Sequence, residues 1–138
     1  MTIERTLGLI KPDGLERGKQ GLILDRVLQK GFKIAAMKQL RLSRKQAEGF
    51  YAEHAARPFF NSLCEFMTSG PIIAMALEKE NAIADWRTLM GATNPANADP
   101  GTLRKDFAVN LEKNTVHGSD SPVSAKREVP YFFSDLEY

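Results

Sequence analysis

The segment that most limits how this chain can fold is a run of six apolar residues at positions 72–77, IIAMAL. Gly70 and Pro71 directly before it interrupt regular structure, so the run begins a new element. A strand with one solvent-exposed face alternates apolar and polar residues, whereas this run has no polar position. Continuous apolar strands are typical of the centre of a sheet that is covered on both faces. The sequence therefore predicts a sheet with a packed layer on each side.

Before this run, the chain reads as a strand, a helix and a second strand. Residues 5–10 are mostly apolar and end where Pro12, followed closely by a glycine, interrupts regular structure. In residues 22–30, apolar side chains recur four positions apart, which gives a helix an apolar face. In residues 32–42, the even positions are apolar except Lys38, and this alternation predicts a half-buried strand.

The later elements are predicted from cap residues and interruptions. Ser43 opens a helix with a capping box, and Asn81 can cap another. A long segment rich in Pro, Asn and Gly reads as a loop, and loops of this length are often functional. We expect helices from Ser43 to before Pro58 and at residues 59–67, 81–90 and 121–133, a loop at 92–103 and a short strand at 114–116.

The order of these elements predicts the fold class. A β-α-β unit is followed by a helical segment, a second β-α-β unit and a closing helix. We expect one domain over residues 1–138 with a ferredoxin-like α/β (α+β) sandwich, in which helices pack on a four-stranded antiparallel sheet. A small doubly wound parallel sheet is the alternative, and it fits less well because strands and helices alternate irregularly.

The composition excludes several classes of protein. Of the 138 residues, 43% are hydrophobic and 26% are charged, as in ordinary globular proteins. No apolar run approaches membrane-spanning length, and the first residues lack the apolar core of a signal peptide. The single cysteine, Cys64, excludes an internal disulfide. The net charge of +2 suits a phosphorylated ligand, and we expect a cytoplasmic protein with no membrane or nucleic-acid partner.

The segment with the most chemical signals is residues 114–122, NTVHGSDSP. Its first three residues can form a short strand at the end of a sheet. Gly118 lets the backbone approach a ligand, and Ser121 followed by Pro122 is a favourable helix start. We therefore expect His117 where a strand stops and a helix begins, near N–H groups that suit an anion. A lone histidine is more often a surface or hydrogen-bonded core residue, so this segment alone leaves both interpretations open.

Other patterns fit known sites less well. Residues 14–20, GLERGKQ, resemble a Walker A loop, but three residues separate the glycines instead of four. Gln20 also replaces the Ser or Thr that would hold Mg²⁺. No His, Asp or Glu cluster has metal-ligand spacing, so we expect no metal site made of protein ligands. His54 lies in a polar helical stretch, and we interpret it as a solvated residue.

Several polar residues are expected at the ends of predicted elements. If they meet in the fold, three cations and two hydrogen-bonding side chains surround the His117 imidazole, which suits a polyphosphate. Taken singly, each is more often an ordinary surface side chain. An exposed ring at Phe59 or Phe60 could stack on a nucleobase. The polar residues are Lys11, Arg87, Thr93, Arg104 and Asn114.

Six segments, in order, carry a resemblance that covers nearly the whole chain. The most specific is Asn-x-x-His-Gly-Ser-Asp at residues 114–120, the active-site signature of nucleoside diphosphate kinases. The chain resembles this family, whose members have a ferredoxin-like core. The six segments are IKPDG at 10–14, RPFF at 57–60, SGP at 69–71, MGATNP at 90–95, PGTLR at 100–104 and NTVHGSDS at 114–121.

The resemblance implies ping-pong catalysis through a covalent intermediate. His117 would attack the γ-phosphate of a nucleoside triphosphate, typically ATP, and become a phosphohistidine. It would then pass the phosphate to a nucleoside diphosphate, which maintains the nucleoside triphosphate pools. The resemblance further implies that Glu128 accepts a hydrogen bond from the other ring nitrogen, and that Ser119 supports this contact.

The resemblance also assigns the nucleotide-binding residues. The distal phosphates would be held by two arginines and a threonine, and the sugar hydroxyls by a lysine and an asparagine. One aromatic ring would stack on the base. The assignments are Arg87, Arg104 and Thr93 for the phosphates, Lys11 and Asn114 for the sugar with Lys11 also near the transferred phosphate, Tyr51 beside His117, Phe59 on the base, and Leu63 and Leu111 along its slot.

The resemblance also has implications for the cofactor and the assembly, and the sequence departs from the family pattern at a few positions. The resemblance implies Mg²⁺ bound mainly through nucleotide phosphates and water, and a homo-oligomer built from dimers, either a tetramer or a hexamer. Trp86, Leu103 and Lys105 depart from the usual pattern, but no motif residue is missing. The alternative is an inactive relative that binds nucleotide or nucleic acid, which should have lost His117 or one of its cationic partners.

Overall fold

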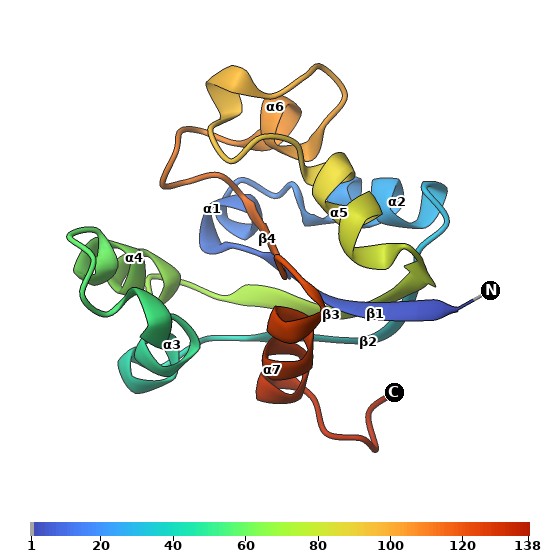
Figure 1. The fold of residues 1–138 in the computed structure, drawn as a ribbon. Helices are drawn as coiled ribbons and strands as arrows, with labels where there is room; N and C mark the ends of the chain where they lie inside the picture. The colour runs from blue at the N-terminus through green and yellow to red at the C-terminus, as the bar shows by residue number, and fades with distance from the viewer. Residues whose placement is uncertain (1) are drawn as a thin grey trace.

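The computed structural model describes residues 2–138 and contains a four-stranded antiparallel sheet in the order β2-β3-β1-β4 (Figure 1). The predicted fold class, a ferredoxin-like sandwich, is confirmed. The strands are β1 (Ile3–Ile10), β2 (Lys33–Leu40), β3 (Ile72–Glu80) and β4 (Val116–Gly118). The helices are α1 (Pro12–Glu16), α2 (Gln20–Gln29), α3 (Arg44–Phe50), α4 (Phe60–Met67), α5 (Ala82–Met90), α6 (Leu103–Phe107) and α7 (Pro122–Phe132), with 3-10 turns η1 (Ala52–His54) and η2 (Pro95–Asn97).

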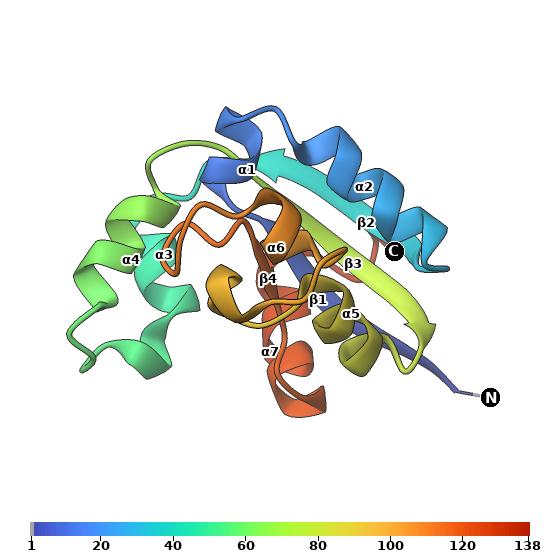
Figure 2. The ribbon, with the colours of Figure 1, turned by 90° about the horizontal axis from the view of Figure 1, so that it is seen from above.

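Helices cover both faces of the sheet. In Figure 1, α2 and α5 lie above the sheet and α7 lies below it, while Figure 2 shows α3 and α4 grouped beyond one end. The apolar run at 72–77 is buried throughout, as the sequence predicted for a strand covered on both faces. Its side chains alternate between two cores: Ile72, Ala74 and Ala76 pack with α3, α4 and α7, and Ile73, Met75 and Leu77 pack with α2, α5 and α6. Within residues 2–138, no helix has the length and apolar character needed to cross a membrane.

The edge strand β2 contains an irregularity that the alternation did not reveal. Ile34 and Ala36 pair with adjacent residues of β3, so Ala35 is an extra residue on β2. Such a bulge moves the side chains that follow it to the opposite face. Ile34 therefore packs toward α2, whereas Ala36 packs toward α7. The predicted single alternation over residues 32–42 is wrong here, because periodicity alone does not locate an extra residue.

Two short helices occur where the sequence analysis predicted breaks or loops. Pro12 begins α1, because a proline lacks only an N–H that would be unpaired in the first turn. α6 follows Thr102, whose hydroxyl accepts a hydrogen bond from the N–H of Lys105 at 3.3 Å. Residues 14–20 span the end of α1 and the start of α2. They do not line the cavity described below, which agrees with rejecting them as a phosphate-binding loop.

The start of α5 is capped by a residue distant in sequence. Asn81 precedes the helix, as predicted, but its φ of 58° is left-handed and its side chain makes no capping hydrogen bond. Instead, Oε1 of Glu4 accepts a hydrogen bond from the N–H of Ile83 at 2.8 Å. The predicted role of the Asn81 side chain is therefore wrong, because an acidic side chain of β1 satisfies that end of the helix.

β4 begins two residues later than predicted. It pairs with β1, and His117 is its middle residue opposite Leu9. Thr115 has a φ of 74°, which is not an extended conformation, so strand pairing starts only at Val116. The predicted strand at 114–116 is therefore wrong in its bounds, and His117 lies within the strand rather than after it.

Gly118 is required for the packing of the core beneath β4. A Cβ atom at this position would overlap the indole of Trp86 and approach Cε of Met90 to 2.7 Å. Trp86 is fully buried, so its departure from the family pattern is accommodated in the core. Gly118 also borders the cavity described next, and the close approach of a ligand to its backbone remains a prediction.

Candidate active site

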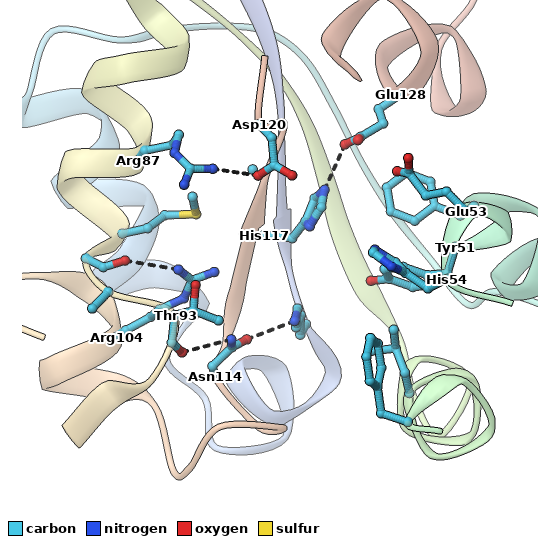
Figure 3. Close-up of a pocket in the computed structure, with 18 residues that line it drawn as sticks. Tyr51, Glu53, His54, Arg87, Thr93, Arg104, Asn114, His117, Asp120 and Glu128 are labelled. Atoms are coloured by element: carbon cyan, nitrogen blue, oxygen red, sulfur yellow. Dashed lines mark hydrogen bonds and ion pairs between the residues drawn. The ribbon is translucent and has the colours of Figure 1, made fainter. Parts of the chain in front are cut away.

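A cavity of about 320 Å³ lies beside β4, and Figure 3 shows His117 projecting into it between the α5 side and the α3–α4 side of the molecule. The cavity is lined by side chains from segments far apart in the sequence, because the antiparallel sheet brings the ends of β1 and β4 together. Most of the predicted residues meet here. Those that line the cavity are Lys11, Tyr51, Phe59, Leu63, Arg87, Thr93, Arg104, Asn114, His117 and Glu128.

The His117 ring is oriented by a buried carboxylate. Its Nε2 lies 2.8 Å from Oε1 of Glu128, a residue of α7 that is 5% exposed. The hydroxyl of Ser119 donates to the same carboxylate oxygen at 3.1 Å. Because an ionised carboxylate only accepts hydrogen bonds, this contact selects the tautomer with the proton on Nε2, and in the neutral ring that tautomer leaves the Nδ1 lone pair unprotonated. The predicted contacts among these three side chains are all present, and they leave one ring nitrogen free to react.

Packing also fixes the position of His117. The Phe50 ring lies edge-on to the imidazole with 5.4 Å between ring centroids. On the other side, Nε1 of Trp86 donates a hydrogen bond to the His117 carbonyl at 3.1 Å. Both the ring and the backbone of this residue are therefore held by buried aromatic side chains, which limits the rotation of the imidazole before any ligand binds.

Lys11 and Asn114 form a buried polar pair. Nζ of Lys11 donates to Oδ1 of Asn114 at 2.8 Å, and the Asn114 amide donates to the Thr93 carbonyl at 3.2 Å. Burial, aided by the nearby charge of Arg104, lowers the pKa of Lys11 from its ordinary value of 10.5 to about 8. A cation with this pKa stays mostly protonated at neutral pH, and an anionic ligand would stabilise its charge.

Arg104 is buried and only partly hydrogen-bonded. Its guanidinium donates to the carbonyls of Gly91 at 3.0 Å and Val116 at 2.9 Å, while its Nε has no partner within the described chain. Burial and the positive charge of Arg87 lower the pKa of Arg104 to about 10, so it remains a cation at neutral pH. A buried cation with an unpaired donor at a cavity wall is well placed for a phosphate.

Arg87 lines the cavity on the same side as Arg104 (Figure 3). Its guanidinium is 2.5 Å from Oδ1 of Asp120, and both side chains are largely exposed. Exposed ion pairs of this kind contribute little stability and exchange readily. Arg87 is therefore free to turn from Asp120 to a ligand. The sequence analysis gave Asp120 no role, since its pairing with Arg87 appears only in the fold.

Tyr51 supplies a hydroxyl with no partner. The side chain is buried, lines the cavity, and its oxygen makes no hydrogen bond with residues 2–138. Burial, followed by the negative charge of Glu128, raises the pKa of this phenol, so it stays a neutral donor. An orphaned buried hydroxyl at a cavity wall points to a ligand that completes its hydrogen bonding.

The opposite end of the cavity is apolar and aromatic. Phe59 is 48% exposed, and Leu63 lies beside it on the wall. His54, which we interpreted as a solvated helix residue, also lines the cavity, with its ring centroid 5.6 Å from that of Phe59. That interpretation is corrected, because the chain turns at η1 and directs His54 inward. Leu111 is 57% exposed and does not line the cavity, so the structure does not bring it to the predicted slot.

One further expectation, an anion site at the start of α7, needs adjustment. The start of α7 is capped by Ser121, whose hydroxyl accepts from the N–H of Ser124 at 3.2 Å, and it does not line the cavity. The anion site expected at this helix start is therefore not part of the cavity. Lys105 is exposed and also lies outside it. Glu53, which the sequence analysis did not select, lines the cavity from η1.

The comparisons with known proteins now bear on this site. The family model described as nucleoside diphosphate kinase matches residues 4–138. A nucleoside diphosphate kinase of Geotalea daltonii is 63% identical over 135 residues, which is 98% of each chain.

The chain belongs to the nucleoside diphosphate kinase family. Two solved nucleoside diphosphate kinases agree with this. The Aquifex aeolicus structure has a TM-score of 0.97 and 45% identity, and the match covers 99% of both chains. The Halobacterium salinarum structure, a complex with CDP, has a TM-score of 0.95 and 43% identity, covering 99% of this chain and 91% of the other. The predicted fold and the predicted enzyme class, a nucleoside-diphosphate kinase, are confirmed.

Proposed function

We propose that His117 is the phosphohistidine nucleophile of this nucleoside-diphosphate kinase. The observation that carries the proposal is the Nε2–Glu128 contact of 2.8 Å, because it leaves the Nδ1 lone pair available inside a cavity lined by cations. Nδ1 attacks the γ-phosphorus of a nucleoside triphosphate, and the bond from phosphorus to the β-γ bridging oxygen breaks. The nucleoside diphosphate leaves with that bond pair. In the second half-reaction, a terminal β-phosphate oxygen of another nucleoside diphosphate attacks the phosphorus of the phosphohistidine. The bond from phosphorus to Nδ1 breaks and returns its electron pair to the ring nitrogen.

The position of the proton on the His117 ring supports separate roles for its two nitrogens. Nε2–H stays hydrogen-bonded to Glu128 while Nδ1 reacts, so the positive charge that develops on the ring faces a carboxylate. Ser119 holds that carboxylate in place. We therefore infer that Glu128 and Ser119 orient the nucleophile and do not exchange protons with the substrate.

The cations and the unpaired donors fit the phosphates. Arg104 and Arg87 both approach the cavity from the α5 side, and Thr93 lies beside Arg104 on the loop after α5 (Figure 3). Charge spreads over the phosphoryl oxygens in the transition state, and fixed cationic donors stabilise it there. Tyr51, whose hydroxyl has no partner in the described chain, supplies a neutral donor beside His117.

The remaining lining residues fit the sugar and the base. Lys11 and Asn114 form a joined donor and acceptor pair suited to sugar hydroxyls. Phe59 presents an exposed ring on which any base can stack, and Leu63 extends that apolar wall. The predicted contact of Leu111 with the base remains a prediction that would require movement of its loop. The relative solved with CDP supports a nucleotide ligand for this cavity.

Mg²⁺ fits the site as a companion of the nucleotide. Among the side chains of residues 2–138, no group of three His, Cys, Asp or Glu residues is placed to hold a metal ion. The cavity instead offers cationic donors, which suit phosphate oxygens that share a hydrated metal. Bound through the phosphates, Mg²⁺ would neutralise part of their charge.

The assembly, domain and location complete the proposal. β2 is an edge strand on which Met37 is 51% exposed, and an open edge can pair with another chain. We infer a homo-oligomer built from dimers, as a tetramer or a hexamer. The single domain over 1–138 and a cytoplasmic location remain predictions, as does the maintenance of nucleoside triphosphate pools.

The test of the proposal is a chemical analysis of the enzyme after incubation with γ-labelled ATP and Mg²⁺ alone. We expect close to one label per active site, stable to alkali and released by acid, as for a phosphorus–nitrogen bond. Adding unlabelled nucleoside diphosphate should transfer the label to the triphosphate. Intact protein that binds nucleotide but takes up no label would instead support the alternative of a binding module.

The depressed pKa of Lys11 gives a second expected result. As the pH rises through about 8, Lys11 of the free enzyme loses its charge, so kcat/KM for nucleotide should fall. Bound phosphates favour the charged form, so the fall in kcat should occur at higher pH. The pH profiles of wild-type enzyme and Lys11→Met should be compared. If kcat/KM falls at the same alkaline pH in wild-type enzyme and in Lys11→Met, the fall is caused by another group.

The lowered pKa of Lys11 also makes the free energy of unfolding depend on pH. The folded chain releases the Lys11 proton near pH 8, whereas the unfolded chain releases it near the ordinary value of 10.5. Between these values the unfolded chain binds more protons, so the contribution of Lys11 to the free energy of unfolding increases with pH across that window. Denaturant unfolding at pH 7.5 and pH 10 checks this, and Lys11→Met should lack that contribution.

A further inference from the structure

Thr115 has an unusual backbone conformation directly between two residues of the active site. Its φ is 74°, and the N–H of Val116 donates to the carbonyl of Asn114 at 2.9 Å. A hydrogen bond between residues two apart, around a central residue with φ near +75°, defines the rarer and strained form of γ-turn. A β-branched residue is poorly suited to this region, so neighbouring groups must hold it there.

The group that holds the turn is a buried carboxylate at the start of α1. The Thr115 hydroxyl donates to Oδ2 of Asp13 at 2.6 Å, and the Thr115 carbonyl accepts from the N–H of Lys11 at 2.7 Å. Asp13 is 2% exposed and Thr115 is fully buried. Gly14 makes room for the arrangement, since a Cβ there would lie 3.0 Å from Cγ2 of Thr115.

The turn determines where the active-site groups on either side of it lie. Before the turn, the Asn114 side chain joins Lys11 at 2.8 Å and Thr93 at 3.2 Å. After it, β4 begins, its first carbonyl accepts from Arg104 at 2.9 Å, and its second residue is His117. A relaxed Thr115 would change the path of the chain through both segments.

We propose that Asp13 is a positioning residue, which acts through the hydroxyl of Thr115 to hold the γ-turn that places Asn114 and directs β4 toward His117. The inference rests on the proposed function, because it assumes that the cavity binds nucleotide. Asp13 itself does not line the cavity. Its effect on catalysis therefore passes through the backbone at Thr115.

A competing explanation is that Asp13 acts through its charge. Burial and Arg104 lower the pKa of Lys11, whereas the charge of Asp13 raises it. The two explanations differ at Thr115, because glycine adopts positive φ without strain and needs no carboxylate to hold it there. A glycine at this position should make Asp13 dispensable only if Asp13 acts by holding the turn.

The experiment compares substitutions at both positions in the full-length enzyme. Thr115→Val and Thr115→Gly both remove the hydroxyl, but only valine keeps the branched Cβ. We expect Thr115→Val and Asp13→Ala to raise KM for a nucleoside diphosphate about 10-fold and to lower kcat per labelled site. Thr115→Gly, and Asp13→Ala in the Thr115→Gly background, should both stay within about threefold of wild type in KM.

Asp13→Asn separates charge from hydrogen bonding, since asparagine keeps an acceptor for the Thr115 hydroxyl. We expect its KM to lie within about threefold of wild type. A purely structural role would reduce the amount of active enzyme and leave KM unchanged, so KM is measured together with the number of labelled sites. Thermal unfolding shows which variants fold. If Asp13→Ala does not fold, the comparison of Thr115→Val with Thr115→Gly still tests whether the turn must be held.

The inference is overturned if Thr115→Val and Thr115→Gly behave alike. It is also overturned if Asp13→Ala raises KM equally in both backgrounds, or if Asp13→Asn is as impaired as Asp13→Ala. Labelling of the wild-type enzyme by γ-labelled ATP is measured in parallel. An unlabelled wild type would refute the proposed function. If the wild type is labelled but Asp13→Ala has the same effect on KM with threonine as with glycine at position 115, only the role of Asp13 is refuted.

Discussion

Replacing His117 by alanine should lower the rate of phosphoryl transfer by at least about 10⁴-fold, because it removes the ring nitrogen that we propose forms the covalent intermediate. His117 is partly exposed at a cavity wall, and its strand is held by backbone pairing with β1 and by Arg104 at the Val116 carbonyl. The variant should therefore fold. The measurements are steady-state transfer from ATP to a nucleoside diphosphate, labelling by γ-labelled ATP, and circular dichroism.

The matched control for this substitution is His54→Ala. His54 is the other histidine of the chain and lines the same cavity, but its ring packs near Phe59 rather than against a carboxylate. We expect this variant to keep its phosphoenzyme label and to show at most a change in KM. Residual transfer in His117→Ala above the background of the assay, or loss of the label in His54→Ala, would contradict the assignment of the nucleophile.

Replacing Arg104 by alanine should lower kcat by about 100- to 1,000-fold, the range observed when one preorganised donor to a developing charge is removed. Arg104 combines burial, a retained positive charge and an unpaired Nε at the cavity wall. Arg104→Lys keeps the charge, but it places all its donors on one nitrogen and lacks the planar fork with which Arg104 reaches two carbonyls from two nitrogens. We expect it to recover only part of the loss in single-turnover phosphoryl transfer.

Arg127 provides a control for the structural part of this effect. Its guanidinium also donates to two backbone carbonyls, those of Gly49 at 2.8 Å and Phe50 at 2.9 Å, but it is exposed and does not line the cavity. Arg127→Ala therefore loses the same kind of contacts and should keep kcat within about threefold of wild type. Equal losses of kcat in the two alanine variants would mean that Arg104 acts only by supporting the backbone.

Apolar patterns and cap residues predicted an element correctly where the residues that determine it lie within that element. The apolar run at 72–77 can be accommodated only as a strand covered on both sides, and it has that position. The capping box at Ser43 is present, with Gln46 and Ser43 bonded to each other's backbone. Ser121 likewise caps α7. These predictions depend on residues a few positions apart, so neighbouring elements had little influence on them.

The errors occur where distant residues determine a local conformation. Asn81 makes no cap because Glu4, from another strand, reaches the same helix end. The alternation in β2 fails at Ala35 because the pairing with β3 includes an extra residue. His54 lines the cavity because the chain turns after α3. For Asn81 and Ala35 the deciding partner is remote in sequence, so periodicity and propensity do not contain the information.

The amino-acid sequence by itself determined the order of the four strands and the longer helices, the two-sided sheet and, through its resemblance to a family, most of the residues that surround His117. Only the tertiary structure decided which nitrogen of that imidazole is free, because its tautomer depends on Glu128 eleven residues away on α7. It also decided that Trp86 donates a hydrogen bond to the His117 carbonyl, and that the hydroxyl of Thr115, whose φ is 74°, donates to Asp13. The physical reason is that hydrogen-bond geometry and strain depend on contacts between segments that only the folded chain brings together.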